Sequence, residues 1–237
     1  MKLSYDEIVT SHEKRDEKYN ITYIEKSSPS KDKLIVLIAT HNSHGKYTSL
    51  ESLFNSNYDY DFLFLNSVDN SYYHRNDSGK SYQDFLFNYL KGYDPAKVVF
   101  FGSSMAGYCA LRWSLAFNAN CVVSNPQINL DESINYAWLE LKTNIIKIPN
   151  RFNIDSVNYP GKETCIVSMF GHHPMDVRSF DRMISLVKGN TGLSLTIDQS
   201  DDINHDYLIK GMDHFMVLIE RVLLMRQTKI KSWIKPA

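Results

Sequence analysis

The chain has 237 residues, of which 43% are hydrophobic and 22% are charged, and its formal net charge is -1. This balance predicts a globular protein with a sizeable core, and the near-neutral charge gives no electrostatic reason to expect nucleic acid or an acidic membrane as a partner. No apolar run approaches the ~20 residues that a membrane helix needs, so we expect no transmembrane segment.

The three cysteines indicate a reducing compartment. Cys109, Cys121 and Cys165 are an odd number without a CxxC spacing, which favours buried free thiols over a disulfide framework or a metal site. The first 20 residues mix both charges and lack the apolar stretch of a signal peptide. We therefore expect a cytoplasmic protein.

Strands and helices are predicted to alternate along the chain. Residues 1–18 form a short helix or a loose lead-in, and the alternating segment that follows predicts an exposed strand over 20–25. Apolar segments, several of them continuous as in strands buried on both faces, predict further strands at 34–39, 61–65, 98–101, 121–124, 164–170 and 193–197. Helical patterns predict two helices that end near residues 54 and 118. Four further helices are predicted over about 82–90, 132–147, 177–188 and 206–226.

This alternation predicts an α/β fold with a mostly parallel sheet covered by helices on both faces. The turn around Ser104, described below, makes the α/β-hydrolase type the expected form of this fold. We expect a single domain over residues 1–237, since the chain has no repeat and no linker. Residues 128–160 mix helical and irregular sequence, and we expect this insertion to form a lid.

The segment 102–107 (GSSMAG) joins a predicted strand directly to a predicted helix, as a nucleophile elbow does. Such a turn needs small residues two positions before and after the nucleophile. Ser104 meets this condition with Gly102 and Ala106, whereas Ser103 has bulky residues in both places. The helix N-terminus there favours a developing negative charge. A glycine-rich turn that only packs closely or binds phosphate is the alternative, although the P-loop and dinucleotide fingerprints are absent.

A base and an acid should follow the nucleophile, in the order serine, acid, histidine. His205 lies in the loop after the last predicted strand, whereas its rival His214 falls inside the pattern of the final helix. Asp176 is the first carboxylate after the preceding strand, and its alternative role is to cap the helix that follows. Asp201 and Asp202 remain as substitutes for the acid.

In this scheme His205 takes the proton of Ser104, and Asp176 fixes the tautomer of the imidazole. The backbone N–H of Met105 and a second N–H near Thr40 or His41 are predicted to bind the oxyanion. An acyl-enzyme forms, which water or an alcohol resolves.

Two groups of residues are predicted to contact substrate. One is a polar loop after the strand at 61–65, and the other is the insertion at 128–160. The candidates are Tyr73, His74 and Arg75 in the loop, and Lys142, with Trp138, Lys147 and Arg151, in the insertion. The alternatives are a solvated surface loop and ordinary helix or core contacts.

A metal site near Asp176 is a further alternative, because His172 and His173 precede it. The spacings HxH and HExxH are absent, so we expect no metal.

Two segments resemble bacterial α/β-hydrolase-type capsular polysaccharide O-acetyltransferases. Residues 102–134 (GSSMAGYCALRWSLAFNANCVVSNPQINLDESI) resemble the GSS-x-GG and PQ motifs of this family, and residues 203–223 (INHDYLIKGMDHFMVLIERVL) resemble its GGHD segment and the helix after it. The resemblance places the nucleophile on Ser104 and the base on His205. The chain departs from the family at Ala106, where the family has glycine, and at the acid, for which Asp176 is the nearest residue.

The resemblance implies O-acetyl transfer from acetyl-CoA, as a substrate and not a bound cofactor, to a hydroxyl of a polysaccharide or oligosaccharide. A carbohydrate esterase or deacetylase with the same triad stays open. So does a non-catalytic partner in polysaccharide biosynthesis or export. The sequence does not address the oligomeric state.

Overall fold

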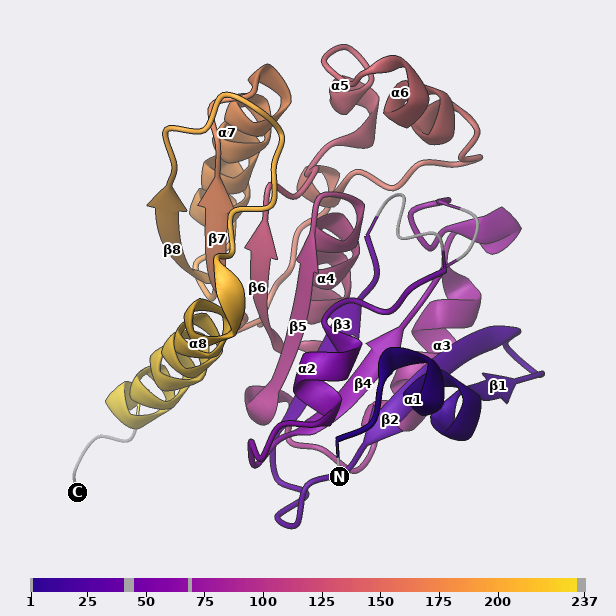
Figure 1. Cartoon of the computed structure of the whole chain (residues 1–237). Helices are drawn as coiled ribbons and strands as arrows, with labels where there is room; N and C mark the ends of the chain where they lie inside the picture. Colours follow the sequence, from indigo (N-terminus) through magenta and orange to yellow (C-terminus); the bar gives the residue numbers. More distant parts are fainter. Residues whose placement is uncertain (1, 41–44, 68–69, 234–237) are drawn as a thin grey trace.

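A single eight-stranded sheet forms the centre of the molecule (Figure 1). The computed structural model describes residues 2–40, 45–67 and 70–233, with side chains up to residue 229. The strands are β1 (Lys14–Asp16), β2 (Ile21–Lys26), β3 (Leu34–Ile38), β4 (Asp61–Leu65), β5 (Val98–Ser103), β6 (Asn120–Ser124), β7 (Cys165–Phe170) and β8 (Ser194–Gln199).

The strand order is β1-β2-β4-β3-β5-β6-β7-β8. The strands from β3 to β8 pair in parallel, and β1 and β2 add an antiparallel edge. The predicted, mostly parallel sheet is therefore confirmed.

Helices cover both faces of this sheet. They are α1 (Tyr5–His12), α2 (Leu50–Phe54), α3 (Lys80–Leu90), α4 (Met105–Phe117), α5 (Leu130–Ser133), α6 (Leu139–Ile146), α7 (Pro174–Gly189) and α8 (Gly211–Trp233), with short 3₁₀ turns η1 (Arg75–Asp77), η2 (Pro95–Lys97) and η3 (Ile154–Ser156). Within the described ranges, none of the helices combines the length and the apolarity that crossing a membrane requires.

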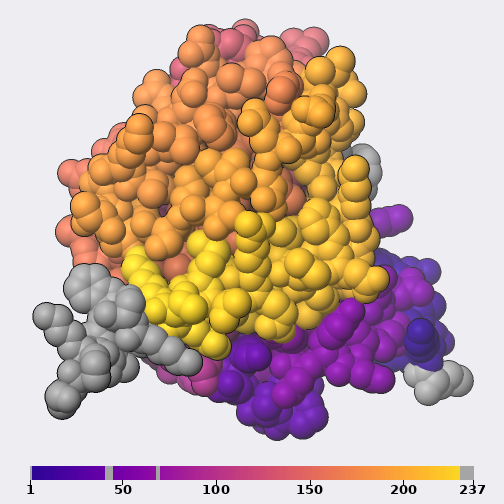
Figure 2. All heavy atoms as spheres, turned by 90° about the vertical axis from the view of Figure 1, so that its left-hand side faces the viewer, coloured from indigo at the N-terminus to yellow at the C-terminus, as the bar shows by residue number. Residues whose placement is uncertain are grey.

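The alternation of side chains along each strand divides the core into two layers. On β5, Val98 and Phe100 pack in the layer under α3, α4 and α7. Val99 and Phe101 face the opposite layer, under α1, α2 and α8. Figure 2 views the molecule from the side of α8, whose yellow atoms lie between the orange C-terminal segments and the violet N-terminal ones. Continuous apolar strands thus become buried on both faces, as a parallel sheet requires.

The structure differs from the sequence prediction in several places, three of which follow. Strand β1 was missed because its three residues are polar and largely exposed, so no apolar pattern marks it. The predicted helix over 132–147 is two helices, α5 and α6, separated by a turn. Helix α8 begins at Gly211 instead of residue 206, so the segment after His205 is non-helical.

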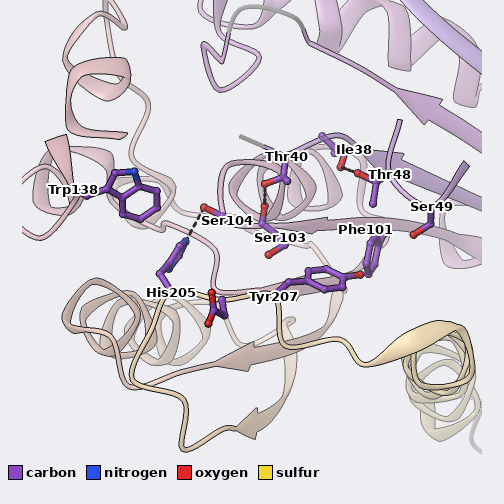
Figure 3. A pocket seen from close by; sticks show the side chains of 11 residues that line it. Ile38, Thr40, Thr48, Ser49, Phe101, Ser103, Ser104, Trp138, His205 and Tyr207 are labelled. Atoms are coloured by element: carbon purple, nitrogen blue, oxygen red, sulfur yellow. Dashed lines mark hydrogen bonds between the residues drawn. The ribbon is translucent and has the colours of Figure 1, made fainter. Parts of the chain in front are cut away.

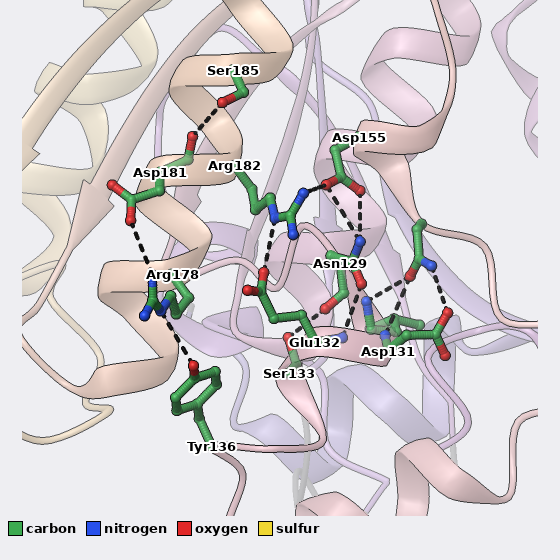
Figure 4. A network of polar contacts seen from close by, with 12 residues as sticks. Asn129, Asp131, Glu132, Ser133, Tyr136, Asp155, Arg178, Asp181, Arg182 and Ser185 are labelled. Atoms are coloured by element: carbon green, nitrogen blue, oxygen red, sulfur yellow. Dashed lines mark hydrogen bonds and ion pairs between the residues drawn. The ribbon is translucent and has the colours of Figure 1, made fainter.

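The insertion stands above the carboxyl ends of the central strands (Figure 1). It is attached to α7 by Arg182, whose Nε donates to Glu132 at 2.8 Å and whose Nη1 pairs with Asp155 at 3.2 Å (Figure 4). Arg178 adds a hydrogen bond of 3.2 Å to the Tyr136 hydroxyl. That the insertion acts as a lid, and that residues 1–237 are one domain, stay predictions.

Candidate active site

Ser104 lies at the turn between β5 and α4, as the small-residue pattern predicts. Its backbone has φ 53° and ψ -119°, a conformation that a residue with a Cβ rarely adopts. The turn is held in place because the Ser104 N–H donates to the Ser124 carbonyl of the neighbouring strand at 2.8 Å. A Cβ at Gly102 would overlap the Ala106 carbonyl, so only glycine fits there. The tight turn therefore explains the sequence GSSMAG.

Two hydrogen bonds join Ser104, His205 and Asp176 (Figure 3 shows the first). His205 Nε2 lies 2.8 Å from Ser104 Oγ, and His205 Nδ1 lies 2.5 Å from Asp176 Oδ1. Because a carboxylate only accepts, Nδ1 carries the proton and Nε2 accepts from the serine hydroxyl. Both side chains are shielded from solvent, at 6% exposure for His205 and 1% for Asp176. This is the arrangement in which an imidazole can act as a general base on a serine.

Asp176 belongs to the first turn of α7, where the helix dipole favours a carboxylate. The alternative role as an N-cap is wrong, because the helix begins at Pro174 and His173 is the cap. The substitute acid Asp202 is hydrogen-bonded within its own loop, where its Oδ1 accepts from the Asn204 N–H at 2.8 Å.

His214, the rival base, is bonded to its own helix start, where its Nδ1 accepts from the Lys210 N–H at 3.0 Å. The structure therefore brings His205, and not His214, to the serine.

Sequence reasoning missed two buried amides that lie between the loops of this site. Asn125 Oδ1 accepts from the Gly171 N–H at 2.9 Å, and Asn125 Nδ2 donates to the Asp206 carbonyl at 2.8 Å. It therefore joins the loop before Asp176 to the loop that carries His205. Gln127 Nε2 lies 3.3 Å from Ser104 Oγ. Both residues belong to the segment NPQ (125–127), whose only signal in the sequence is its resemblance to a family motif.

A pocket of about 450 Å³ opens over the serine. In Figure 3 the indole of Trp138 lies on one side of Ser104 and His205, and Phe101 and Tyr207 lie on the other. The Trp138 and His205 ring centroids are 5.6 Å apart. Trp138 is the one candidate from the insertion that is found among the described residues lining this pocket. A bound substrate would thus meet an aromatic surface beside the base.

Of the three residues predicted to donate to the oxyanion, the structure describes Met105 and Thr40. Met105 is the first residue of α4, directly after Ser104. Thr40 lines the pocket, and its hydroxyl donates to the Ser103 carbonyl at 2.7 Å. His41 lies outside the described residues. Binding of an oxyanion by these N–H groups stays a prediction.

The predicted substrate contacts in the loop after β4 were wrong for Tyr73 and His74, because both side chains are fully buried. The Tyr73 hydroxyl donates to the Ala39 carbonyl at 2.8 Å. His74 Nε2 lies 2.8 Å from the Tyr108 hydroxyl, and burial, aided by the charge of Arg112, lowers the pKa of His74 to about 3. These side chains hold the interior together and cannot reach a substrate.

The remaining substrate candidates lie away from the pocket lining. Arg75 donates from Nη1 to the Tyr19 carbonyl at 2.8 Å and so supports the N-terminal region. Arg151 pairs with Asp131 at 2.6 Å, within the insertion. Lys142 and Lys147 are exposed on and beside α6, and contact of Lys142 with substrate stays a prediction.

His173 completes a group with Asp176 and His205 whose donor atoms all lie within 4.8 Å of one another. Such a group has the donor types of a metal site. Here the Asp176 and His205 donors are already hydrogen-bonded to each other, and His173 Nδ1 accepts from the Met175 N–H at 3.3 Å. Burial lowers the pKa of His173. The expectation of no metal stays a prediction.

The sheet order, the strand–serine–helix turn and the Ser–His–Asp geometry define an α/β-hydrolase fold with the side-chain arrangement of serine enzymes of that type. No protein-family model matches the chain, and a comparison with curated proteins finds no significant similarity.

Three solved structures share the fold over most of their length. The capsule O-acetyltransferase of Neisseria meningitidis serogroup A matches with a TM-score of 0.64 and 15% identity over 91% of this chain and 94% of its own. The Francisella virulence factor BioJ has a TM-score of 0.59 and 9% identity, with 91% and 83% coverage. The fluorophosphonate-binding serine hydrolase F of Staphylococcus aureus has a TM-score of 0.56 and 16% identity, with 90% and 96% coverage. At these identities the likeness shows the α/β-hydrolase fold.

Proposed function

We propose that the chain is an enzyme that transfers an acyl group through Ser104 to a hydroxyl of a bacterial polysaccharide or oligosaccharide. The observation that carries the acyl chemistry is the unbroken pair of hydrogen bonds from the Ser104 hydroxyl through His205 to Asp176. A non-catalytic partner in polysaccharide biosynthesis or export would have no need for this alignment.

In the first step Ser104 Oγ attacks the acyl carbonyl of the donor while His205 Nε2 takes the hydroxyl proton. The imidazolium gives this proton to the leaving group, and an acyl-serine remains. In the second step His205 takes the proton of the acceptor hydroxyl, whose oxygen attacks the acyl-serine. Ser104 Oγ then leaves and regains a proton from His205. Asp176 holds the tautomer and stabilises the imidazolium throughout.

The negative charge that develops on the carbonyl oxygen of the acyl group must be stabilised by hydrogen-bond donors at the pocket. We assign the Met105 N–H at the start of α4 and a second N–H at Thr40 or His41. The position of Met105 directly after the nucleophile supports the first assignment.

We propose acetyl-CoA as the donor and a glycan hydroxyl as the acceptor. Two arguments support transfer over hydrolysis: the family resemblance of the segments around Ser104 and His205, and the fold shared with a capsule O-acetyltransferase. Water in place of the sugar would give an esterase or deacetylase with the same residues, a candidate favoured by the fold shared with a serine hydrolase. The unbonded state of Cys109, Cys121 and Cys165 supports a cytoplasmic location.

Labelling with a fluorophosphonate tests the nucleophile. We expect the wild-type chain to be labelled on Ser104, and Ser104→Ala and His205→Ala to lose labelling by roughly 10⁴-fold. His214→Ala is the matched histidine control and should label normally. A wild-type chain that stays unlabelled would contradict the acyl chemistry.

Product analysis then separates transfer from hydrolysis. The chain is incubated with acetyl-CoA, with and without a de-O-acetylated bacterial capsular polysaccharide, and acetylated glycan and free acetate are measured. Transfer predicts that acetyl groups appear on the glycan. Acetate as the sole product, or release of acetate from an acetylated glycan, would favour the esterase.

A further inference from the structure

Gln127 is a fully buried amide beneath the nucleophile. It follows β6 at the carboxyl end of the sheet, and its side chain lies near both reacting groups. Gln127 Nε2 is 3.3 Å from Ser104 Oγ and 3.4 Å from His205 Nε2. A buried amide costs free energy unless its donors and acceptor are satisfied, so its partners indicate what it does.

The orientation of this amide follows from two further partners. The Asn125 backbone carbonyl lies 3.4 Å away and can only accept, so the nearby atom must be the nitrogen. The Tyr72 hydroxyl lies 3.1 Å from Gln127 Oε1 and donates to it. Tyr72 is itself fully buried, and burial raises its pKa well above the usual value, so the hydroxyl keeps its proton. The N–H group is therefore directed at Ser104 by contacts on both sides of the amide.

We propose that Gln127 is a further catalytic residue, whose side-chain N–H donates to Ser104 Oγ and stabilises the negative charge that develops on that atom. This inference rests on the proposed function. The charge appears twice: when His205 takes the hydroxyl proton before attack, and when the bond between the acyl carbon and Oγ breaks in the second step. Gln127 gains and loses no proton in either step.

The distance of 3.3 Å is long for such a bond in the resting site, in which the hydroxyl is neutral. A donor that strengthens its bond only as charge develops lowers the barrier without stabilising the ground state equally. Tyr72 has a supporting role in this arrangement, because its hydroxyl keeps the amide from turning its oxygen towards the serine.

The test measures the rate of fluorophosphonate labelling of the full chain, resolved into the maximal rate of modification and the half-saturating probe concentration. Gln127→Met removes the N–H at nearly constant volume. We expect the maximal rate to fall roughly 10–100-fold, somewhat less than the loss of an oxyanion-hole donor typically costs. The half-saturating concentration should not change, since the probe does not contact the buried amide.

Tyr72→Phe is the second variant. It removes only the hydroxyl that orients the amide, and it should lower the maximal rate in the same direction by about 3–10-fold. Asn120→Leu is the matched control, because Asn120 is an equally buried amide whose Nδ2 donates to the Ala96 and Val98 carbonyls, at the amino-terminal end of the strands. Its folded fraction should label at the wild-type rate.

The outcomes separate the two proposals. Failure of the wild-type chain to label contradicts the proposed function. Normal labelling of the wild type together with wild-type maximal rates for folded Gln127→Met and Tyr72→Phe overturns the role of Gln127 and leaves the function standing. If Gln127→Met does not fold, the maximal rate of Tyr72→Phe decides.

Discussion

The indole of Trp138 lies with its ring centroid 5.6 Å from that of the His205 imidazole, although 67 residues separate them along the chain. The Trp138 residue is 41% exposed, whereas the His205 side chain is 6% exposed. An acceptor hydroxyl must come within hydrogen-bond distance of His205 Nε2 to lose its proton. In the proposed reaction, the group that carries this hydroxyl would therefore pass beside the indole.

We expect Trp138→Ala to weaken acyl transfer to a glycan more than hydrolysis of a small ester. Loss of the aromatic surface should raise the KM for the glycan about 10-fold, which corresponds to the ~1.4 kcal/mol of a modest apolar contact. Hydrolysis of p-nitrophenyl acetate should change less than about 3-fold, because His205 keeps its bonds to Ser104 and Asp176. Leu139→Ala, at the neighbouring exposed position, is the control. An equal loss for both substrates would contradict a role in acceptor binding.

Asn125 stabilises the fold as well as the site. Replacement by alanine leaves the buried Gly171 N–H and the part-buried Asp206 carbonyl without their partner, and it places alanine at a φ of 45°. We expect Asn125→Ala to lower the free energy of unfolding by about 2–4 kcal/mol. Urea denaturation measures this change. Asn150→Ala provides the comparison, because Asn150 is exposed at a similar φ of 52° and reports the backbone cost alone. Equal losses in the two variants would refute the bridging role.

The turn at Ser104 has no room for a methyl group at Gly102. We expect Gly102→Ala to lower the free energy of unfolding by about 3 kcal/mol, since a Cβ there would overlap the Ala106 backbone and neither strand β5 nor helix α4 can shift independently. Gly92→Ala should stay within about 0.5 kcal/mol of the wild type, because its Cβ would meet nothing within 4 Å. Thermal and urea unfolding of both variants measure the difference. A folded Gly102→Ala of normal stability would show that the turn is looser than described.

His74 makes stability depend on pH. The unfolded imidazole has a pKa near 6.5, whereas the pKa of the buried group in the folded chain is about 3. Between these values the unfolded state binds one more proton, so the free energy of unfolding falls as the pH falls, by up to about 1.4 kcal/mol per pH unit from this group. We expect His74→Gln to reduce the slope between pH 6 and pH 4 by close to one proton.

The same substitution at the exposed His172 serves as the control for the loss of an imidazole on the surface. Measurement of the free energy of unfolding by urea at several pH values gives the slope for each variant. Equal slopes for wild type and His74→Gln would mean that the His74 imidazole becomes protonated in the folded chain.

The sheet and the turn at Ser104 could be predicted from sequence because their causes are local. Apolar strands buried on both faces give continuous runs, and the turn leaves a signature of small residues around one serine. The positions of His205 and Asp176 followed from the order of the elements, since parallel strands bring the loops after them to the same edge of the sheet.

The incorrect predictions and the missed residues have a common cause: the residues that these side chains contact are distant in sequence. Tyr73 and His74 were predicted to lie in a polar loop. Their hydrogen-bond partners, the Ala39 carbonyl and the Tyr108 hydroxyl, come from other elements and leave no mark on the local sequence. Gln127 contacts His205, which is 78 residues away. No local spacing records such a contact. Polar residues at the ends of buried strands are therefore ambiguous until the fold is known.

Arg182 connects the insertion to the helix that carries the catalytic acid, Asp176. Its guanidinium holds Glu132 and Asp155, both in the insertion, and it stands six residues after Asp176 on the same helix. Because Arg182 and Asp176 both belong to α7, we expect a displacement of the insertion to be passed to the Asp176 carboxylate, so that the shape of the cavity and the alignment of the imidazole change together.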